Sequence, residues 1–231
     1  MTELHVLRVF LGPDGRGGNP LGVFLDGPAI PQARRQEVAG ELGFSETVWV
    51  DAVKDRRATI RIFTPTVEMI FAGHPTVGTS WLLHETGRPV DVLEVPAGDV
   101  ATWRDGELSW IRARAEWANG LIQPRQFDSP AEVDALTPGR IGDPGLYAWA
   151  WEDEAAGRVR VRFFATNVGI LEDEATGLGG VVMGDLLGRP ITIRQGVGSE
   201  LHVRPDPATG FVAVGGRVAP IEVRAFPDGG R

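Results

Sequence analysis

Cysteine is absent from the chain of 231 residues, which excludes disulfides, thiolate metal sites and every mechanism that uses a cysteine. Histidine is scarce as well, because the chain has only four, at positions 5, 74, 84 and 202. None of them lies at the spacing of paired metal ligands, so the sequence predicts no structural metal site. Carboxylates and single histidines are left as the side chains that could titrate near neutral pH.

Positive charge is also limited: lysine occurs once, and the net charge is −8. No stripe rich in lysine or arginine is present, which makes nucleic acids and anionic membranes poor partners. No apolar run approaches the ~20 residues that a membrane-spanning helix needs. The first residues lack the basic and apolar regions of a signal peptide, so we expect a cytoplasmic protein. With 42% hydrophobic residues, the chain can form a substantial core.

Two segments alternate apolar and polar residues with a period of two, which is typical of half-buried strands: Arg57–Phe63 and Arg158–Phe164. They are separated by 158 − 57 = 101 residues. The same shift aligns Gly78 with Gly179, and Gly87-Arg88-Pro89 with Gly188-Arg189-Pro190. Chance could explain matching alternation alone, but the repeated Gly-Arg-Pro favours a tandem duplication.

Each copy is predicted to be a mixed α/β unit, with domains over residues 1–104 and 105–225 and a tail over 226–231. Helices are expected over 31–42, 76–85, 130–136 and 176–187; strands are expected over 4–10, 21–25, 48–53, 58–63, 107–112, 158–164, 192–195, 201–204 and 211–214. Turns are expected at 12–15 and 17–20, where glycine, proline, aspartate and asparagine are concentrated. The two copies would form a cleft in which a small molecule binds.

Two glycine-rich loops lead into the equivalent helices, over 71–79 and 172–180. Thr76 and Thr176 are candidate N-caps. The first turn of a helix offers unpaired N–H groups and a partial positive charge, which suit a carboxylate or a phosphate. Two such helix ends related by duplication could hold one anionic ligand from both sides. The alternative is that these residues only cap their helices.

Three titratable residues lie in or near these loops. His74 stands between glycine and proline at a helix start, where the helix dipole favours a neutral imidazole that can relay a proton. Asp173 occupies the matching loop, although an acid before a helix is often only a partner for the dipole. Glu46 lies between a helix end and an apolar strand, where burial would raise its pKa into the range of a general acid/base. The 101-residue shift places Tyr147 opposite Glu46, which predicts one central acid/base.

Several motifs occur in an order that resembles the phenazine biosynthesis PhzF-like family, which shares the diaminopimelate epimerase fold. They are Gly18-Asn19-Pro20-Leu21-Gly22-Val23, Phe44-Ser45-Glu46-Thr47, Arg61-Ile62-Phe63-Thr64-Pro65 with Glu68, Phe71-Ala72-Gly73-His74-Pro75-Thr76-Val77-Gly78, Glu172-Asp173-Glu174-Ala175-Thr176-Gly177 and Gln195-Gly196. The Phe-Thr-Pro and Gly-His-Pro-Thr stretches are the most specific of these. The resemblance extends over nearly the whole chain.

The resemblance implies an α+β fold of two pseudo-symmetric domains, each a curved, largely antiparallel sheet or barrel around a central helix. It implies an isomerase or epimerase that moves a proton next to a carboxylate without a cofactor or metal, commonly as a homodimer. Glu46 would be the general acid/base, with His74 and Asp173 as the other catalytic residues. The residues expected to bind the substrate are Asn19, Gly73, Thr76, Thr176, Gly177, Leu178 and Gln195.

The chain also departs from the family pattern in its second half. Glu174 replaces a proline, Leu178 replaces a small hydroxyl residue, and the stretch 200–203 differs. A catalytically degenerate protein that only binds a carboxylate is therefore the alternative. A hydrolase using Ser45 or Ser199 is less favoured, because no Gly-x-Ser-x-Gly motif is present. A dinucleotide-binding fold is disfavoured because the glycines at 177–180 follow a loop rather than a strand.

Overall fold

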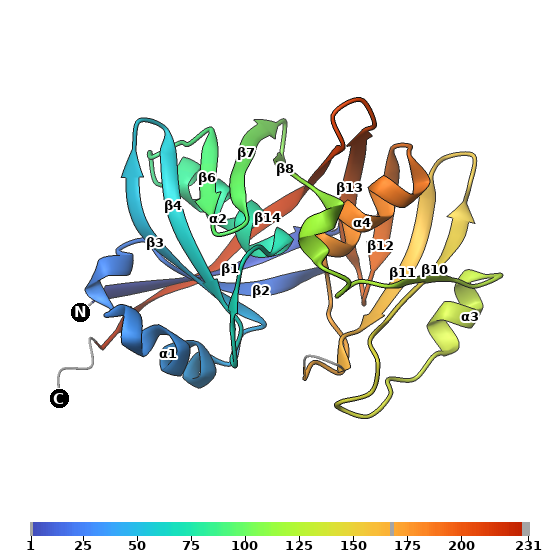
Figure 1. Cartoon of the computed structure of the whole chain (residues 1–231), viewed down its shortest axis with the longest axis horizontal. Helices are drawn as coiled ribbons and strands as arrows, with labels where there is room; N and C mark the ends of the chain where they lie inside the picture. The colour runs from blue at the N-terminus through green and yellow to red at the C-terminus, as the bar shows by residue number, and fades with distance from the viewer. Residues whose placement is uncertain (1, 167–168, 228–231) are drawn as a thin grey trace. The chain divides into compact units, whose positions relative to one another are not determined.

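The computed structural model describes residues 2–166 and 169–227, which form two compact units (Figure 1). The first unit contains residues 2–9, 20–111 and 218–227, and the second contains residues 10–19 and the described part of 112–217. Four strands contain a unit boundary, because the divisions at residues 9, 19, 111 and 217 fall within β1, β2, β8 and β14. The compact units therefore do not coincide with the continuous domains 1–104 and 105–225 that the sequence predicts.

The strands are β1 (Thr2–Leu11), β2 (Gly17–Phe24), β3 (Glu46–Lys54), β4 (Arg57–Phe63), β5 (Glu68–Met69), β6 (Val92–Val95), β7 (Gly98–Asp105), β8 (Leu108–Ala113), β9 (Pro124–Gln126), β10 (Leu146–Asp153), β11 (Arg158–Phe164), β12 (Ile191–Gln195), β13 (Ser199–Asp206) and β14 (Phe211–Phe226). The α-helices are α1 (Arg35–Leu42), α2 (Gly73–Glu85), α3 (Pro130–Ala135) and α4 (Gly177–Leu187). Short 3₁₀ helices cover Gly27–Ala29, Gln32–Arg34 and Ala115–Ala118.

The first unit contains a mixed sheet in the order β1-β2-β3-β4-β6-β7-β8, in which β2–β3 and β4–β6 are parallel pairs. Helix α2 is its central helix, because all of its first eight residues are buried. Its buried residues are polar as well as apolar and include His74, Thr76 and Ser80, so the helix lies inside the unit instead of on the surface. Figure 1 shows α2 among strands β3, β4, β6 and β7.

A second core of the first unit lies between the sheet and α1. The Phe24 and Trp49 rings stack with centroids 5.4 Å apart, and Phe63 meets Trp49 edge to face at 5.1 Å. The helix contributes Val38 and Ala39, both buried. Helix α1 then ends at Gly43, whose φ of +67° is the left-handed conformation that glycine adopts without strain. The chain is thereby turned into β3 at Glu46.

The second unit repeats this arrangement with the order β14-β13-β12-β11-β10-β9. Its central helix is α4, whose residues Gly177–Val181 are all buried. Gly184 faces β13 and β14 so closely that a Cβ would lie 2.6 Å from Val203 and 2.5 Å from Val212. Small residues therefore let this helix pack directly on the strands. The mixed α/β fold with a central helix in each half is the one that the sequence predicts.

The duplication is visible in matching contacts of the two units. In the first, Arg61 on β4 pairs with Glu68; in the second, Arg162 on β11 pairs with Glu172. The arginines differ by 162 − 61 = 101 and the glutamates by 172 − 68 = 104. The second copy therefore has three additional residues between the strand and the segment that pairs with it, so the shift of 101 does not hold in that segment. It holds again after the helices, because the Asp91 N–H bonds the Arg56 carbonyl as the Thr192 N–H bonds the Gly157 carbonyl.

Two local expectations are wrong. The predicted turn at 17–20 is instead the beginning of β2, where Gly17 and Gly18 have φ of +68° and +84°, left-handed values that glycine adopts without strain. The helix predicted from Thr76 begins three residues earlier, at Gly73, with Ala72 as its N-cap. Pro75 then lies in the first turn, where its missing N–H costs nothing because no acceptor precedes it. His74 consequently belongs to the helix and not to a loop.

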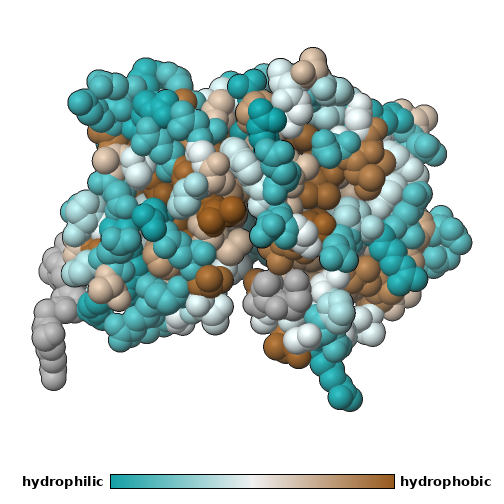
Figure 2. Space-filling view, viewed as in Figure 1, coloured by the Kyte–Doolittle hydropathy of each residue, from teal (hydrophilic) through white to brown (hydrophobic). Residues whose placement is uncertain are grey.

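The surface is consistent with the composition. Figure 2 shows hydrophilic side chains over much of the viewed face, with apolar residues scattered among them. Among the described residues, no helix combines the length and the apolar character needed to cross a membrane.

Candidate functional site

The first unit brings Glu46 and His74 together. Glu46 is the first residue of β3 and pairs with Leu21 of β2, while His74 is the second residue of α2. The Nδ1 atom of His74 lies 3.5 Å from Oε2 of Glu46. Their side chains are only 4% and 15% exposed, respectively. A carboxyl and an imidazole at this distance, both shielded from water, have the geometry that proton transfer requires.

Burial alters the protonation of Glu46. Removal from water penalises the charged carboxylate and raises the pKa of Glu46 to about 7, although a hydrogen bond with the Ser45 side chain opposes this shift. The Oε2 atom is buried and has no hydrogen-bond partner among the described residues. Such an unsatisfied buried acceptor costs folding free energy and is characteristic of functional sites. The protonated and ionised forms of Glu46 are thus both accessible near neutral pH.

The other predicted residues of this helix start support its geometry. Thr76 is fully buried, and its hydroxyl donates to the Ala72 carbonyl at 2.6 Å. It is therefore not the N-cap that the sequence predicts, because the N-cap position is Ala72. Gly73 is the first helical residue, so its N–H has no acceptor within the helix. Substrate binding by Gly73 and Thr76 stays a prediction.

The second unit assembles a polar network around Asp173. Its Oδ1 atom accepts a hydrogen bond from the Asn19 amide at 2.7 Å, and its Oδ2 atom accepts one from the Thr176 hydroxyl at 2.5 Å. The Asn19 amide also donates to the Ala175 carbonyl at 3.1 Å. Asn19 and Asp173 are 154 residues apart in the sequence. The network therefore joins the two sequence segments that the second unit takes from opposite halves of the chain.

Gln195 fixes the direction of these hydrogen bonds. Its Oε1 atom accepts from the Thr176 N–H at 3.1 Å, so its Nε2 group must be the donor. That group donates to the Thr176 hydroxyl at 2.8 Å and to the Asp173 carbonyl at 2.9 Å. Because the Thr176 oxygen already accepts from Gln195, its proton is directed at Asp173. Asp173 is thereby held as an acceptor on both carboxylate oxygens.

Thr176 occupies the predicted N-cap position of α4, but its hydroxyl bonds Asp173 instead of a helix N–H. Gly177 and Leu178 form the first turn of this helix and are buried. Since α4 begins 177 − 73 = 104 residues after α2, Leu178 matches His74. Asp173 pairs with Phe163 on β11 in an antiparallel bridge, just as Met69 pairs with Ile62 on β4. Asp173 is therefore the counterpart of Met69 in the second unit.

The predicted equivalence of Tyr147 and Glu46 is wrong. Tyr147 pairs with Phe163, and Val48 pairs with Ile62, the counterpart of Phe163 in the first unit. Tyr147 is therefore the counterpart of Val48. The reason is the longer hairpin of the second unit, which has four residues between β10 and β11 where the first has two between β3 and β4. The two extra residues change the shift along β10 from 101 to 99.

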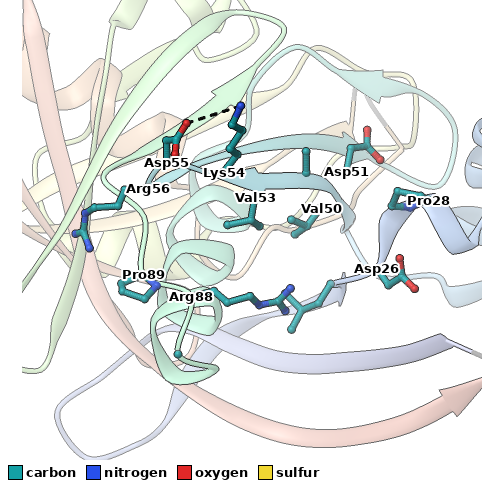
Figure 3. Close-up of a pocket in the computed structure, with 13 residues that line it drawn as sticks. Asp26, Pro28, Val50, Asp51, Val53, Lys54, Asp55, Arg56, Arg88 and Pro89 are labelled. Atoms are coloured by element: carbon teal, nitrogen blue, oxygen red, sulfur yellow. Dashed lines mark ion pairs between the residues drawn. The ribbon is translucent and has the colours of Figure 1, made fainter.

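A surface hollow of about 570 Å³ in the first unit contains none of the predicted site residues (Figure 3). It is lined by Leu25, Asp26, Pro28, residues 50–56 and Gly87-Arg88-Pro89. Arg56 is paired with Asp91 outside it, and Asp51 with the buried Arg35. Within the described residues, no group of three or more histidine, aspartate or glutamate side chains could hold a metal ion.

Ser199, from its sequence only a possible nucleophile, has another place in the structure. Its hydroxyl is fully buried, donates to Glu174 at 2.7 Å and accepts from the Gly18 N–H at 2.8 Å. No histidine is among these partners, so the hydrolase reading gains no support. The signal for this contact was the departure from the family pattern at Glu174, whose partner could not be read from local sequence.

Comparison with known proteins agrees with this fold and these motifs. The phenazine biosynthesis-like protein family matches residues 13–135. The trans-2,3-dihydro-3-hydroxyanthranilate isomerase of Pseudomonas fluorescens is 31% identical, over 78% of this chain and 81% of that protein. An uncharacterized isomerase of Pasteurella multocida is 27% identical, over 89% of this chain and 85% of its own.

Solved structures show the same fold at lower identity. A phenazine biosynthesis protein of the PhzF family from Enterococcus faecalis superposes with a TM-score of 0.78 at 18% identity, over 96% of this chain and 97% of that one. A hydroxyproline epimerase from Agrobacterium vitis superposes with a TM-score of 0.60 at 13% identity, covering 96% and 91% of the two chains. The resemblance inferred from the motifs is confirmed. The chain belongs to the phenazine biosynthesis-like protein family, whose fold it shares with isomerases and epimerases.

Proposed function

We propose that this protein is an isomerase that moves a proton on a carbon next to the carboxylate of a small molecule, with Glu46 as the general acid/base and no cofactor. The observation that carries the proposal is the buried Glu46 carboxyl, with a pKa raised to about 7 and one oxygen without a hydrogen-bond partner among the described residues. A base is most effective when its pKa lies near the working pH.

The chemistry requires one residue to act twice. The ionised Glu46 takes a proton from the carbon next to the carboxylate, and the electron pair of the broken C–H bond delocalises into the adjacent unsaturated system. The protonated Glu46 then returns the proton to a different carbon of the same molecule. Atoms and electrons balance without an oxidant or a reductant. His74, 3.5 Å from Glu46, would hold the proton or a polar group of the substrate during this exchange.

We assign Asp173 to the same substrate. Because the donors of Asn19 and Thr176 hold it as an acceptor, Asp173 suits an N–H or O–H group of the ligand rather than its carboxylate. The substrate carboxylate would instead be bound by N–H groups at the starts of α2 and α4, where the helix dipole favours an anion.

The test is solvent-deuterium incorporation. The purified protein is incubated in D₂O with trans-2,3-dihydro-3-hydroxyanthranilate, the compound in the name of the Pseudomonas fluorescens relative, and with a panel of small hydroxy and amino acids. We expect an isomerised product carrying deuterium, detected by NMR. Glu46→Gln should abolish it, whereas Glu41→Gln, at an exposed position of α1, should not. Full activity of Glu46→Gln would disprove the proposed mechanism.

A second candidate is a carboxylate-binding protein without turnover. It is favoured by Leu178, which places a buried apolar side chain where the family has a small hydroxyl residue and where the first unit has His74. In that case a panel ligand raises the melting temperature but gains no deuterium. The predicted homodimer and cytoplasmic location are further proposals, which light scattering and cell fractionation would test.

A further inference from the structure

Glu174, at the position where the chain departs from its family, anchors the turn between β12 and β13. Both of its carboxylate oxygens accept from the Val197 N–H, at 3.1 Å and 3.0 Å, and Oε1 also accepts from the Ser199 hydroxyl at 2.7 Å. Its carboxylate lies over Gly196, where a Cβ would come within 2.0 Å of Oε2. A proline at position 174 could make none of these hydrogen bonds.

Ser199 extends this contact to the beginning of β2. Its fully buried hydroxyl accepts from the Gly18 N–H at 2.8 Å, while its own proton goes to Glu174. The backbones approach very closely here, because a Cβ on Gly17 would lie 2.4 Å from the Ser199 nitrogen. Gly17 also has a φ of +68°, which disfavours any residue with a side chain. The glycines before Asn19 are therefore explained by the docking of this segment against Ser199.

These contacts close a ring with the network described above. Asp173 and Glu174 are neighbours in the chain, as are Gly18 and Asn19. The Asn19 amide donates to Asp173, and the Gly18 N–H donates to the Ser199 hydroxyl that is bound to Glu174. The segment carrying Asn19 is thus held at two adjacent points, one on each of the two acidic residues.

We propose that Glu174 and Ser199 form a positioning pair, which holds Gly18 in place and thereby keeps the Asn19 amide on Asp173. Without the pair, the Gly18 N–H would lose its hydrogen bond to the Ser199 hydroxyl and the Asn19 amide would leave Asp173 for part of the time. Neither residue needs to touch the substrate. The functional consequence rests on the role proposed above for Asp173, whereas the structural consequence can be measured without any substrate.

The test follows the side-chain amide of Asn19 by ¹H–¹⁵N NMR. In Ser199→Ala and in Glu174→Ala, we expect its resonances to move toward those of an exposed asparagine and its hydrogen exchange to speed up about tenfold. Glu174→Gln keeps an oxygen that can accept from Ser199 and should preserve the wild-type signal. The matched control is Ser109→Ala, because Ser109 is equally buried but its hydroxyl has no partner among the described residues.

A wild-type Asn19 signal in either alanine variant would overturn the proposal. If Ser199→Ala fails to fold, Glu174→Ala carries the test, because Glu174 is only half-buried.

With an active substrate in hand, Ser199→Ala and Asn19→Ala should lower kcat/KM by similar factors, and the double variant should lose nothing further. Additive losses would show that Ser199 does not act through Asn19. If no compound of the panel is turned over, the proposed function is contradicted, and the NMR result still decides this inference.

Discussion

The starts of α2 and α4 are duplicated in position but opposite in chemistry. Near α2, the Glu46 carboxyl has lost water and has few partners, which raises its pKa to about 7. Near α4, the Asp173 carboxylate accepts hydrogen bonds on both oxygens. Where one unit has His74, the other has Leu178, and where one has Met69, the other has Asp173. The two helix starts thus differ: one unit has a carboxyl that can change protonation near neutral pH, and the other has a carboxylate held as an acceptor.

The largest expected effect comes from neutralising each carboxylate in turn. Glu46→Gln removes the group proposed as the general acid/base, so turnover should fall by about 10²–10⁴-fold. Asp173→Asn keeps the shape but cannot accept from Asn19 and Thr176 in the same way, so we expect mainly a higher KM and a smaller loss of kcat. Steady-state kinetics of both variants would measure the difference. Equal losses of kcat would erase the proposed division of roles.

The next largest expected effect is a loss of stability that depends on how tightly each central helix is packed. A Cβ on Gly179 would lie 2.2 Å from the Tyr147 ring, whereas a Cβ on Gly78 would meet the ends of Leu21 and Val9 at 2.5 Å and 2.7 Å. A buried aromatic ring can move away from a new methyl group less easily than the ends of aliphatic side chains can. Gly179→Ala should therefore lower stability more than Gly78→Ala, by roughly 3 kcal/mol against 1–2 kcal/mol.

Thermal unfolding of the two alanine variants measures this comparison. Tyr147→Leu in the Gly179→Ala background should restore part of the loss, since it removes the ring atoms that the new methyl group meets. The same leucine in the Gly78→Ala background is the control and should restore nothing. A smaller loss for Gly179→Ala than for Gly78→Ala would contradict the packing argument.

The raised pKa of Glu46 makes a further prediction about stability and pH. Folding raises this pKa from 4.5 to about 7, so the folded state holds the proton more tightly than the unfolded state. The resulting stabilisation is present below pH 4.5 and is lost as the pH rises toward 7. Relative to Glu46→Gln, the wild type should lose up to about 3 kcal/mol over this interval. Urea unfolding at several pH values would show it, with Glu41→Gln as the control.

Much of the fold could be read from the sequence because periodic elements are local. Alternation predicted Arg57–Phe63 and Arg158–Phe164 as strands, and the glycines after Leu42 and Leu187 predicted the ends of α1 and α4. The exact equivalences could not be read, because a hairpin longer by two residues and a loop longer by three change the shift between copies. A constant shift of 101 therefore matched Tyr147 to the wrong residue.

The candidate site divides in the same way. Glu46 and His74 could be proposed together because each occurs in a recognisable motif. The helix start at Gly73 was missed because Pro75 was taken to precede the helix, although the first turn of a helix tolerates proline. The network of Asn19, Asp173 and Ser199 could not be derived, because residues 154 and 181 positions apart meet only after folding. Polar contacts of this range have no periodic signature in the sequence.

The smallest expected effect concerns Tyr147, and it sharpens the comparison between the units. Burial raises the pKa of the Tyr147 hydroxyl above its ordinary value, and the charge of Asp173 adds to this shift. The hydroxyl is buried without a hydrogen-bond partner among the described residues. Tyr147 therefore does not take the place of Glu46 as a proton donor or acceptor in the second unit.

Tyr147→Phe should leave turnover within about twofold and stability unchanged or higher by up to about 1 kcal/mol, because it removes a polar group that gains nothing from folding. Kinetics and thermal unfolding measure both quantities. A loss of turnover comparable to that of Glu46→Gln would mean that the second unit supplies its own proton-transfer group, and the asymmetry between the two helix starts would then have to be abandoned.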